Sequence, residues 1–542
     1  MRYLLLETGG ALLGFPPLVW LSLYALALAF IYLICLVVWR MFLCPQANIP
    51  GATLAKLTFW YEFYYDVVKS GQYIWKIRQL HDKYGPIIRI NPEEVHIQDA
   101  DFYDEVYSGA TRKRNKWSFF TNQSGLTSSA FATDDHDLHR MRRAALNPYF
   151  SKQRVRQLQP RIEKSLNNLL GRINDFMVSG GPMTVGLAYA ALANDIVMDY
   201  AFGRSENRLL APDFDPSFKE AGEAGAKLGH LVKQMPWLLQ IMKLLPDGLQ
   251  VALNPVMASY IKLNQDVIRH VTRIYSHRHD PHSQYNSQTT VFHEILQSDL
   301  PEREKIPNRL WQDGQVTVIA GTLTTAAALS EITFHLLDQP MRLRKLKTEL
   351  DSISSNSEQL PDIARLEQLP YLTAVIKEGL RLSSGISTRL QRIATEETLT
   401  FTTRNPYQDS DNAIRKQYIL RPGIPLSMTG LLIHHSPTYF DDPMAFWPER
   451  WLENKSLDKY LVPFSRGTRS CVGINLAYAE LYLTIATVFG RYGSKDVHSP
   501  SDVGWLELYK TSRRDLDIIG DGVTPLYRVG TKGVVIKVHP MD

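Results

Sequence analysis

The sequence predicts a predominantly α-helical protein with small β-sheets and a single N-terminal transmembrane helix. Near the N-terminus, residues 18–38 form an almost unbroken apolar run. The sequence pattern from residue 138 to 382 is mainly helical. On either side of this stretch, short runs of β-branched residues stand beside proline and glycine. With 542 residues, 44% of them hydrophobic, the chain can bury one large core.

The apolar run is expected to cross a membrane as a helix of about residues 18–39. About twenty residues at a rise of ~1.5 Å each span a hydrocarbon core ~30 Å thick. Trp20 and Trp39 fall near the two expected interfaces, and Arg40 follows at once, which favours a cytoplasmic location for the rest of the chain. A cleaved signal peptide and a buried core helix are the alternatives. The run is long for a signal peptide and lacks a small-x-small cleavage site.

A turn-forming hinge, Ile49-Pro50-Gly51-Ala52, follows the apolar run. After it we find no Gly/Ser-rich linker, charge block or internal repeat. We therefore expect a membrane anchor with its flanks at residues 1–45 and one catalytic domain at residues 46–542.

Within that domain the elements follow from local patterns. Residues 87–90 and 95–97 read as strands, because two β-branched runs are separated by Asn-Pro. A central helix is expected to begin near Pro307 and to end before Pro340, about 30 residues and some 45 Å long. A last strand is expected within residues 533–538.

Charge and cysteine content limit the classes of function. A net charge of +5 is too small to suggest nucleic-acid binding, and it is compatible with docking of an acidic redox partner. The three cysteines, Cys35, Cys44 and Cys471, offer no sensible disulfide framework. They indicate a reducing compartment.

The chain is organised around Cys471. It stands in a glycine-flanked loop directly before a helix-like run, an arrangement that suits a single thiolate ligand to a heme iron. Gly467 and Gly473 permit backbone geometry and close approach of a macrocycle that a Cβ would block. Arg469 offers a cation for a propionate, and Phe464 can shield the sulfur. The alternative is a buried cysteine beside a turn.

Residues 464–473 match the heme-binding signature F-x-x-G-x-R-x-C-x-G of the cytochrome P-450 family at every fixed position. The chain is identified as a member on that motif, and the resemblance covers about residues 49–540. It implies the cytochrome P-450 fold and heme b (iron protoporphyrin IX) with Cys471 as the axial ligand to the iron. It also implies no flavin in this chain, with electrons from NADPH delivered by a separate NADPH–cytochrome P-450 reductase, and with cytochrome b5 as a second candidate donor.

Two further motifs resemble the family's charged triad behind the heme loop. Glu378 and Arg381 stand three residues apart, so they share one helix face and can pair. Arg450, about twenty residues before Cys471, resembles the arginine that joins this pair. Buried charges persist only when they satisfy one another, so all three are expected to lie together; a pair on a solvated helix is the alternative.

Three basic residues are candidates to bind the heme propionates. His139 and Arg143 occupy the positions of the family's W-x-x-x-R element, with histidine in place of tryptophan. Arg392 matches a further propionate arginine of the family. A basic solvated helix face is the alternative for His139.

The oxygen-binding motif A-G-x-[D/E]-T-T is matched only in part. Ala320 and Gly321 lie one turn before Thr324, so a groove with a hydroxyl is expected over the iron. Thr324 would donate a hydrogen bond there and help to deliver protons. The family usually places an acid before this threonine, whereas this chain has Leu323, so water, Thr325 or a substrate hydroxyl must help, or the chemistry differs. Helix packing of small residues is the alternative.

By the resemblance, five segments are expected to line the distal pocket: residues 116–132, 225–256, 320–325, 383–388 and 523–530. Their apolar side chains and their two hydroxyls suit a lipophilic, weakly polar substrate, with ordinary core packing as the alternative. These side chains are Trp117, Phe119, Phe120, Leu126, Phe131, Ile386, Ser384 and Ser387.

Two further segments have competing interpretations. The apolar stretch 231–253 is expected either to dip into the membrane as a substrate entrance or to form a core helix. Residues 112–116, Arg-Lys-Arg-Asn-Lys, are expected to form a solvated basic loop.

The expected function is that of a monooxygenase anchored in the endoplasmic reticulum membrane, with its catalytic domain on the cytoplasmic side. Residues 382–390 and 475–482 resemble microsomal enzymes of filamentous fungi that tailor secondary metabolites, such as terpenoids or polyketides. An isomerase, dehydratase or oxidative coupling enzyme on the same fold is the first alternative, which Leu323 supports. A membrane-bound heme carrier or sensor is the second.

Overall fold

The computed structural model describes residues 17–255, 257–280, 290–353, 361–403 and 416–541. It is mostly helical (58%) with small sheets, which confirms the predicted fold class. The helices are α1 Pro17–Val38, α2 Thr53–Leu57, α3 Trp60–Phe63, α4 Tyr73–Tyr84, α5 Tyr103–Val106, α6 Ser118–Thr121, α7 His136–Leu146, α8 Lys152–Arg156, α9 Gln159–Ser179, α10 Val185–Phe202, α11 Ser217–Gln234, α12 Pro236–Leu244, α13 Asp247–Leu253, α14 Met257–Ser276, α15 Val291–Gln297, α16 Pro307–Asp338, α17 Pro340–Ile353, α18 Ile363–Leu366, α19 Pro370–Ser383, α20 Gly430–His434, α21 Arg450–Glu453 and α22 Ile474–Arg491.

The strands are short. They are β1 Ile87–Arg89, β2 Val95–Ile97, β3 Arg114–Asn115, β4 Met183–Thr184, β5 Arg392–Ala394, β6 Leu399–Thr402, β7 Gln417–Leu420, β8 Pro425–Ser427, β9 Tyr492–Gly493, β10 Gly504–Leu508, β11 Gly520–Gly522, β12 Thr524–Leu526 and β13 Val535–Pro540. One five-stranded sheet has the order β1-β2-β8-β5-β3, and a four-stranded sheet has the order β4-β13-β10-β9. The predicted strands β1 and β2 pair antiparallel, with Ile88 opposite His96.

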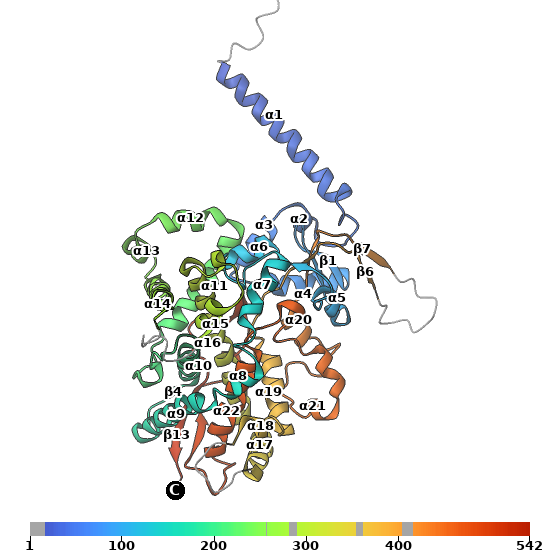
Figure 1. Ribbon diagram of the computed structural model, residues 1–542. Coiled ribbons are helices and arrows are strands. Elements are labelled where there is room, and N and C mark those ends of the chain that lie inside the picture. Colours follow the sequence, from blue (N-terminus) through green and yellow to red (C-terminus); the bar gives the residue numbers. More distant parts are fainter. Residues whose placement is uncertain (1–16, 256, 281–289, 354–360, 404–415, 542) are drawn as a thin grey trace, which may run out of the picture.

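Helix α1 is exposed along its length and stands clear of the rest of the molecule (Figure 1). Its apolar residues run on into a π-helical turn, Trp39–Leu43. By length and composition the helix Trp20–Leu43 can cross a membrane, and none of its apolar window is buried. Among the described residues these side chains have no protein surface that buries them, which is consistent with the expected anchor and excludes the core-helix alternative.

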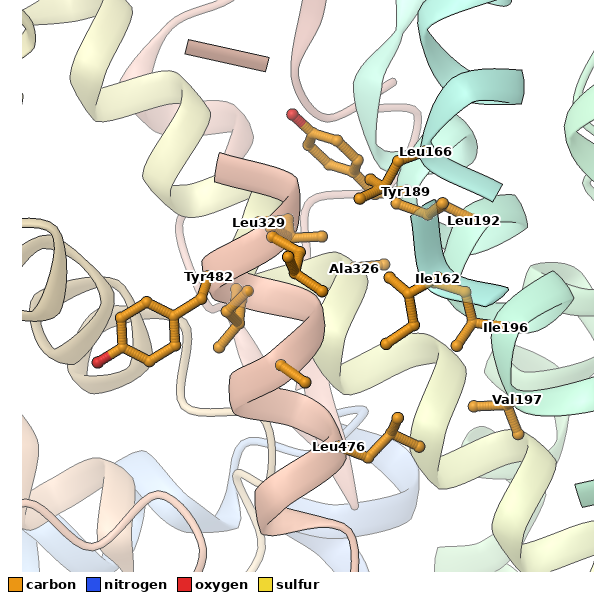
Figure 2. Close-up of a cluster of buried hydrophobic side chains, with 14 of the residues drawn as sticks. Ile162, Leu166, Tyr189, Leu192, Ile196, Val197, Ala326, Leu329, Leu476 and Tyr482 are labelled. Carbon is orange, nitrogen blue, oxygen red and sulfur yellow. The ribbon is translucent and has the colours of Figure 1, made fainter. Parts of the chain in front are cut away.

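Helix α16 is the centre of the fold. Its bounds match the predicted start at Pro307 and stop before Pro340, because proline supplies the N-terminal turn and the next helix begins at the second proline. Helices α10, α14, α19 and α22 pack against it. Figure 2 shows the interior where α9, α10, α16 and α22 meet, with Leu476 of α22 and Ala326 of α16 facing into one apolar cluster.

The stretch predicted either to dip into the membrane or to form a core helix is not a core helix. It forms the end of α11 and then α12 and α13, and no side chain of α12 or α13 is buried. Leu244 is 83% exposed and Leu253 is 71% exposed. In Figure 1, α12 and α13 lie at the end of the body from which α1 emerges.

Candidate functional site

The Cys471 loop holds its sulfur at the start of a helix. The backbone N–H of Cys471 donates to the carbonyl oxygen of Phe464 at 2.9 Å, and α22 begins three residues after the cysteine. The side chain is accessible to solvent, yet burial raises the pKa of the thiol, while the Gly473 N–H and Arg143 lower it. A thiol that is both accessible and desolvated faces a hollow inside the protein, and it needs a metal or a cation to stay ionised.

The two glycines of the loop serve different ends. Gly467 has φ +71°, and a Cβ there would meet the carbonyl oxygen of Ser108 at 2.1 Å, so the fold itself requires glycine. At Gly473 an added Cβ would meet only the Cys471 sulfur, at 3.9 Å. The packing of the protein therefore does not require glycine at position 473. A flat macrocycle lying over the sulfur would require glycine there. Phe464, the predicted shield, is half-buried and lies against Tyr478 with ring centroids 5.4 Å apart.

A group of basic side chains is buried beside this loop. Burial lowers the pKa of Lys116, Arg392 and Arg469. Repulsion from Arg392 lowers the pKa of Lys116 and Arg469 further, and Arg469 does the same to Lys116. His139 is buried among them, and burial together with the nearby cations, first Arg469, lowers its pKa to about 2. Its Nδ1 has no hydrogen-bond partner among the described residues. Arg143 is close to Cys471 and donates to the carbonyl oxygen of Ser470 at 2.8 Å.

These residues fit heme. Within the described residues, Lys116, Arg143, Arg392 and Arg469 form no ion pair with a carboxylate, and buried cations without counter-charges are costly. The two propionates of heme b would supply the missing negative charge, with Cys471 as the axial ligand. When bound, heme supplies the activation of O₂ and the transfer of oxygen; the residues here anchor it, exclude water and set its orientation.

Arg469 and Arg392, both predicted to bind a heme propionate, also donate hydrogen bonds to backbone carbonyl oxygens. The guanidinium of Arg469 donates to the carbonyl oxygens of Arg114, Thr133, Asp134 and Asp135 at 2.6 to 3.2 Å. It therefore ties the segment before α7 to the cysteine loop in addition to contributing charge. Arg392 donates to the adjacent carbonyl of Gln391 at 2.9 Å and stacks over a tyrosine ring.

The predicted basic loop 112–116 is wrong in its second half. Arg114 and Lys116 are 2% and 5% exposed, and Lys116 donates to the carbonyl oxygen of Phe131. Only Arg112 and Lys113 are solvated, with side chains 41% and 43% exposed. Arg114 lies in β3, the edge strand beside β5, where its guanidinium donates to the carbonyl oxygens of Lys113 and Glu105 and pairs with Glu397.

On α16 the predicted oxygen groove is only partly as expected. Ala320 is exposed in the middle of an otherwise largely buried helix, so it too faces the interior hollow. Thr324 donates its hydroxyl to the carbonyl oxygen of Ala320 at 2.7 Å, and the hydroxyl must rotate to reach a ligand. Gly321 faces α10 instead, because a Cβ there would meet Val197 at 2.6 Å. Its small size lets the two helices approach, so the helix-packing alternative applies to this residue.

Leu323 packs against α11. A Cβ added to Gly222 of α11 would meet the Leu323 side chain at 2.6 Å, so the two residues are in close contact. The position that is acidic in the family's motif is therefore an apolar contact between α11 and α16 in this chain.

The hydroxyls predicted to line the pocket already have partners. Ser384 donates to the carbonyl oxygen of Arg381 at 3.2 Å, and Ser387 donates to the carboxylate of Asp521 at 2.8 Å. Gly385 lies against Thr324, where an added Cβ would be 3.2 Å from the threonine Cβ. The segment 383–388 thus borders the threonine with glycine and apolar surface instead of free hydroxyls.

The three residues of the predicted charge cluster lie together. Glu378 pairs with Arg381 at 2.8 Å and with Arg450 at 3.2 Å, and all three side chains are at most 4% exposed. Trp447 N–H and Trp451 Nε1 also donate to the Glu378 carboxylate, each at 2.9 Å. The cluster ties α19 to α21 and to the segment that leads into the cysteine loop.

Two features were missed by the sequence reasoning. One is a buried ion cluster in which Lys233 of α11 binds Glu62 at 2.6 Å and Asp66 at 2.7 Å. The other is Glu480 of α22, a carboxyl that is 1% exposed. Neither has a sequence signal, because an isolated acid in a helix is indistinguishable from a solvated one until the packing is known.

Comparison with known proteins agrees with this geometry. The family model for Cytochrome P450 matches residues 55–502. The chain is 49% identical to "Cytochrome P450 monooxygenase tpcC" of Cochliobolus heterostrophus, over 95% of this chain and 97% of that protein. It is 40% identical to "Tryptophan 6-hydroxylase fscE" of Fusarium equiseti, over 93% and 94%. It is also 41% identical to "Cytochrome P450 monooxygenase astB" of Talaromyces wortmannii, over 96% and 97%.

The match extends over most of the chain, includes the cysteine loop, and agrees with a buried basic cradle suited to heme propionates. This chain belongs to the cytochrome P-450 family and is a heme-thiolate monooxygenase.

Proposed function

We propose that this enzyme oxygenates a lipophilic small molecule of fungal secondary metabolism, with an anchor at residues 1–45 and a catalytic domain at residues 46–542. The observation that carries the proposal is that Cys471, directly before α22, and Ala320, on α16, are both accessible although these two helices pack against each other. Heme held by Cys471 would oxidise a substrate bound there, and Ala320 and Thr324 would border that substrate. Cys471 would ligate the iron, and His139, Arg143, Arg392 and Arg469 would hold the propionates.

The lining supports a weakly polar substrate. Ser384 and Ser387 are satisfied by the protein, so they offer little to a polar ligand. Phe120 and Leu126 are buried, and the ring of Phe120 lies 6.5 Å from that of Phe131. A terpenoid or polyketide fits such a wall because apolar contacts bind it without unpaired polar groups.

The relatives point to a competing substrate class. Two of them are named for the hydroxylation of tryptophan and of N-acetyltryptophan, at 40% and 38% identity. An amino acid carries a carboxylate, which requires a buried cation that is not already engaged. Lys233 of α11 is already paired with two carboxylates. Lys116, which is also buried, belongs to the basic group whose counter-charge the heme propionates would supply, so we favour the neutral substrate.

The proposed position in the cell is supported by the exposed apolar helices. The exposed apolar faces of α12 and α13 lie at the end of the body from which α1 emerges, where they would contact the bilayer and admit an apolar substrate (Figure 1). We propose the endoplasmic reticulum membrane, with NADPH–cytochrome P-450 reductase as the electron donor on the cytoplasmic side and cytochrome b5 as a second donor.

The test compares metabolites of the source organism with and without this chain by mass spectrometry. We expect a neutral precursor to accumulate that lacks one oxygen relative to the lost product, and growth under heavy-isotope oxygen gas should label that product. Direct binding of tryptophan and N-acetyltryptophan, followed by the heme absorption shift, tests the competing class. Tight binding of either amino acid would contradict the neutral substrate.

Leu323 favours one alternative, an isomerase, dehydratase or coupling enzyme, since such reactions need less proton delivery. A precursor isomeric with its product, or differing only by hydrogen or water, would establish that alternative and exclude oxygen insertion.

A further inference from the structure

The turn at residues 49–52, predicted as a hinge between the anchor and the catalytic domain, is packed into the body. Ile49 is 1% exposed and joins a buried apolar cluster with side chains of β1 and β2. The carbonyl oxygen of Pro50 accepts a hydrogen bond from the backbone N–H of Arg89 at 2.7 Å. A Cβ on Gly51 would lie 2.3 Å from the carbonyl oxygen of Arg89, so only glycine permits this contact. A segment held in this way does not bend as a flexible linker would.

The last turn of the anchor helix lacks a donor for one of its carbonyl oxygens. From Trp39 to Leu43 the helix adopts the π register, in which an N–H bonds to the carbonyl five residues earlier, as the N–H of Cys44 does to Trp39 at 2.8 Å. In this register the carbonyl of Arg40 would pair with the N–H of the residue at position 45. That residue is Pro45, which has no N–H. The Arg40 carbonyl therefore needs a donor from outside the helix.

Arg89 supplies that donor from the catalytic body. Its side chain is fully buried at the end of β1, and its Nη1 donates to the carbonyl oxygen of Arg40 at 2.6 Å. The thiol of Cys44 is 3.3 Å from the same oxygen and is a weak donor. The Nη2 of Arg89 donates to the carbonyl oxygen of Pro92 at 2.6 Å, and Gln46 donates to that oxygen at 3.0 Å. One side chain thus joins the end of the anchor helix to β1 and to the turn after β1.

The charge of Arg89 fits the end of a helix. Arg89 forms no ion pair with a carboxylate among the described residues, and burial lowers its pKa. A buried cation without a counter-charge is costly. The C-terminal end of a helix carries the negative end of the helix dipole, and a cation placed there is stabilised. The anchor helix therefore stabilises the buried guanidinium, and the guanidinium holds the anchor helix.

A second contact fixes the same turn to another element. The guanidinium of Arg40 donates to the carbonyl oxygen of Leu57, the last residue of α2. Helix α2 also packs against the π-helical turn. The anchor helix cannot swing relative to the body unless the contacts of Arg89 and Arg40 break together, which is the property of a rigid joint.

We propose that Arg89 locks the anchor helix to the catalytic body, so that the two parts move in the membrane as one unit. The orientation of α1 in the bilayer then fixes the orientation of the body. The exposed apolar helices α12 and α13 lie at the end of the body from which α1 emerges (Figure 1), so a rigid joint keeps them against the bilayer. The proposal rests on the anchor role proposed for residues 1–45.

The first test measures how far the body swings about the anchor. Cys35 is exposed on α1 and Asp82 is exposed on α4, so nitroxide labels on Cys35 and on Asp82→Cys report the distance between anchor and body. Pulsed electron paramagnetic resonance is recorded on the full-length holoenzyme in phosphatidylcholine vesicles, with Cys44→Ala in every sample. With Arg89 in place the distribution of label–label distances should be narrow. Arg89→Gln should broaden it several-fold, because the cation that joins the two carbonyl oxygens is lost. A broad distribution with Arg89 present, or an equally narrow one in Arg89→Gln, would overturn the proposal.

Gly51→Ala tests the joint without a change of charge. The added Cβ would meet the carbonyl oxygen of Arg89 at 2.3 Å, so the turn must move away from β1. The distance distribution should broaden in this variant too. If Arg89→Gln binds no heme, Gly51→Ala carries the test, and a narrow distribution in that variant would then overturn the joint.

The matched control is Lys347→Met. Lys347 of α17 is also a buried cation, and it donates to the carbonyl oxygen of Phe489 at 2.9 Å and to the carboxylate of Asp502 at 2.7 Å. Helix α17 lies at the opposite end of the body from α1 (Figure 1). Lys347→Met should lower stability and leave the distance distribution narrow. Broadening equal to that of Arg89→Gln would mean a general loosening of the fold and would overturn the proposal.

Two further measurements separate the joint from its premise and from its consequence. If the full-length protein does not float with the vesicles in a density gradient, the anchor role has failed and the joint fails with it. If it floats and its distances are broad, only the joint has failed. Arg89→Gln should also reduce the quenching of Trp237 by brominated lipids, because α12 is no longer held at the bilayer. Unchanged quenching in a variant with broad distances would overturn the claim that the joint keeps α12 in place.

Discussion

Removal of the Glu378 carboxylate should cost this enzyme a large part of its stability. In the folded protein Glu378 accepts hydrogen bonds from the buried side chains of Arg381, Arg450 and Trp451, and from the partly buried backbone N–H of Trp447. Glu378→Ala leaves two buried guanidinium groups without a counter-charge. Breaking a buried pair in this way costs about 3–5 kcal/mol, whereas a domain is stable by only about 5–15 kcal/mol.

The assay is denaturant unfolding of the full-length holoprotein, with the yield of heme-loaded protein as a second readout. Glu378→Ala should lose about 3–5 kcal/mol and most of its heme-loaded yield, with Glu378→Gln between it and the wild type. The control is Asp458→Asn. It breaks the pair between Asp458 and Lys377, and Lys377 lies beside Glu378 on α19. That pair is 2.8 Å long and half-exposed on its acidic side, so its loss should cost about 1 kcal/mol or less. Equal stability of the alanine variant and the control would refute the reasoning.

Three further predictions concern other parts of the molecule. Leu323→Asp should lower the free energy of unfolding by on the order of 1–3 kcal/mol without improving turnover, because its carboxylate would lie partly buried against Gly222; a stable variant that converts more of its NADPH into product would contradict this. Burial lowers the pKa of His81 from 6.5 to about 4, so the unfolded chain binds the proton first, and stability falls as the pH drops below about 6.5. Between about pH 7.5 and about pH 5.5 the wild type should lose about 1.4 kcal/mol that His81→Gln does not lose, measured by denaturant midpoints; equal losses would contradict the assignment. Trp237, which is 58% exposed on α12, should be quenched by brominated lipids in the full-length protein, and Trp237→Phe should remove that quenched component; equal quenching in both would place α12 outside the bilayer.

The features that could be predicted from the sequence are local ones or depend on a motif with fixed spacing. The bounds of α16 follow from two prolines, and α1 follows from an uninterrupted apolar run. The convergence of Glu378, Arg381 and Arg450 could be expected because charged residues in these motifs can be buried only together.

The remaining features depend on which segments fold over one another. Lys116 looked solvated in a run of basic residues, and only the packing of its loop against the cysteine loop buries it. Gly321 looked like part of a ligand groove, whereas its free side faces Val197 of α10. Glu480 gave no signal, because its missing partners can be recognised only in three dimensions.

The central claim is that Cys471 holds heme iron as a thiolate beneath the Thr324 groove, and one spectrum tests it most directly. Reduced full-length enzyme treated with carbon monoxide should show the red-shifted Soret band that thiolate ligation produces, and Cys471→Ser should lose that band. A wild-type spectrum typical of a histidine-ligated heme, or a shifted band that survives in Cys471→Ser, would contradict the account.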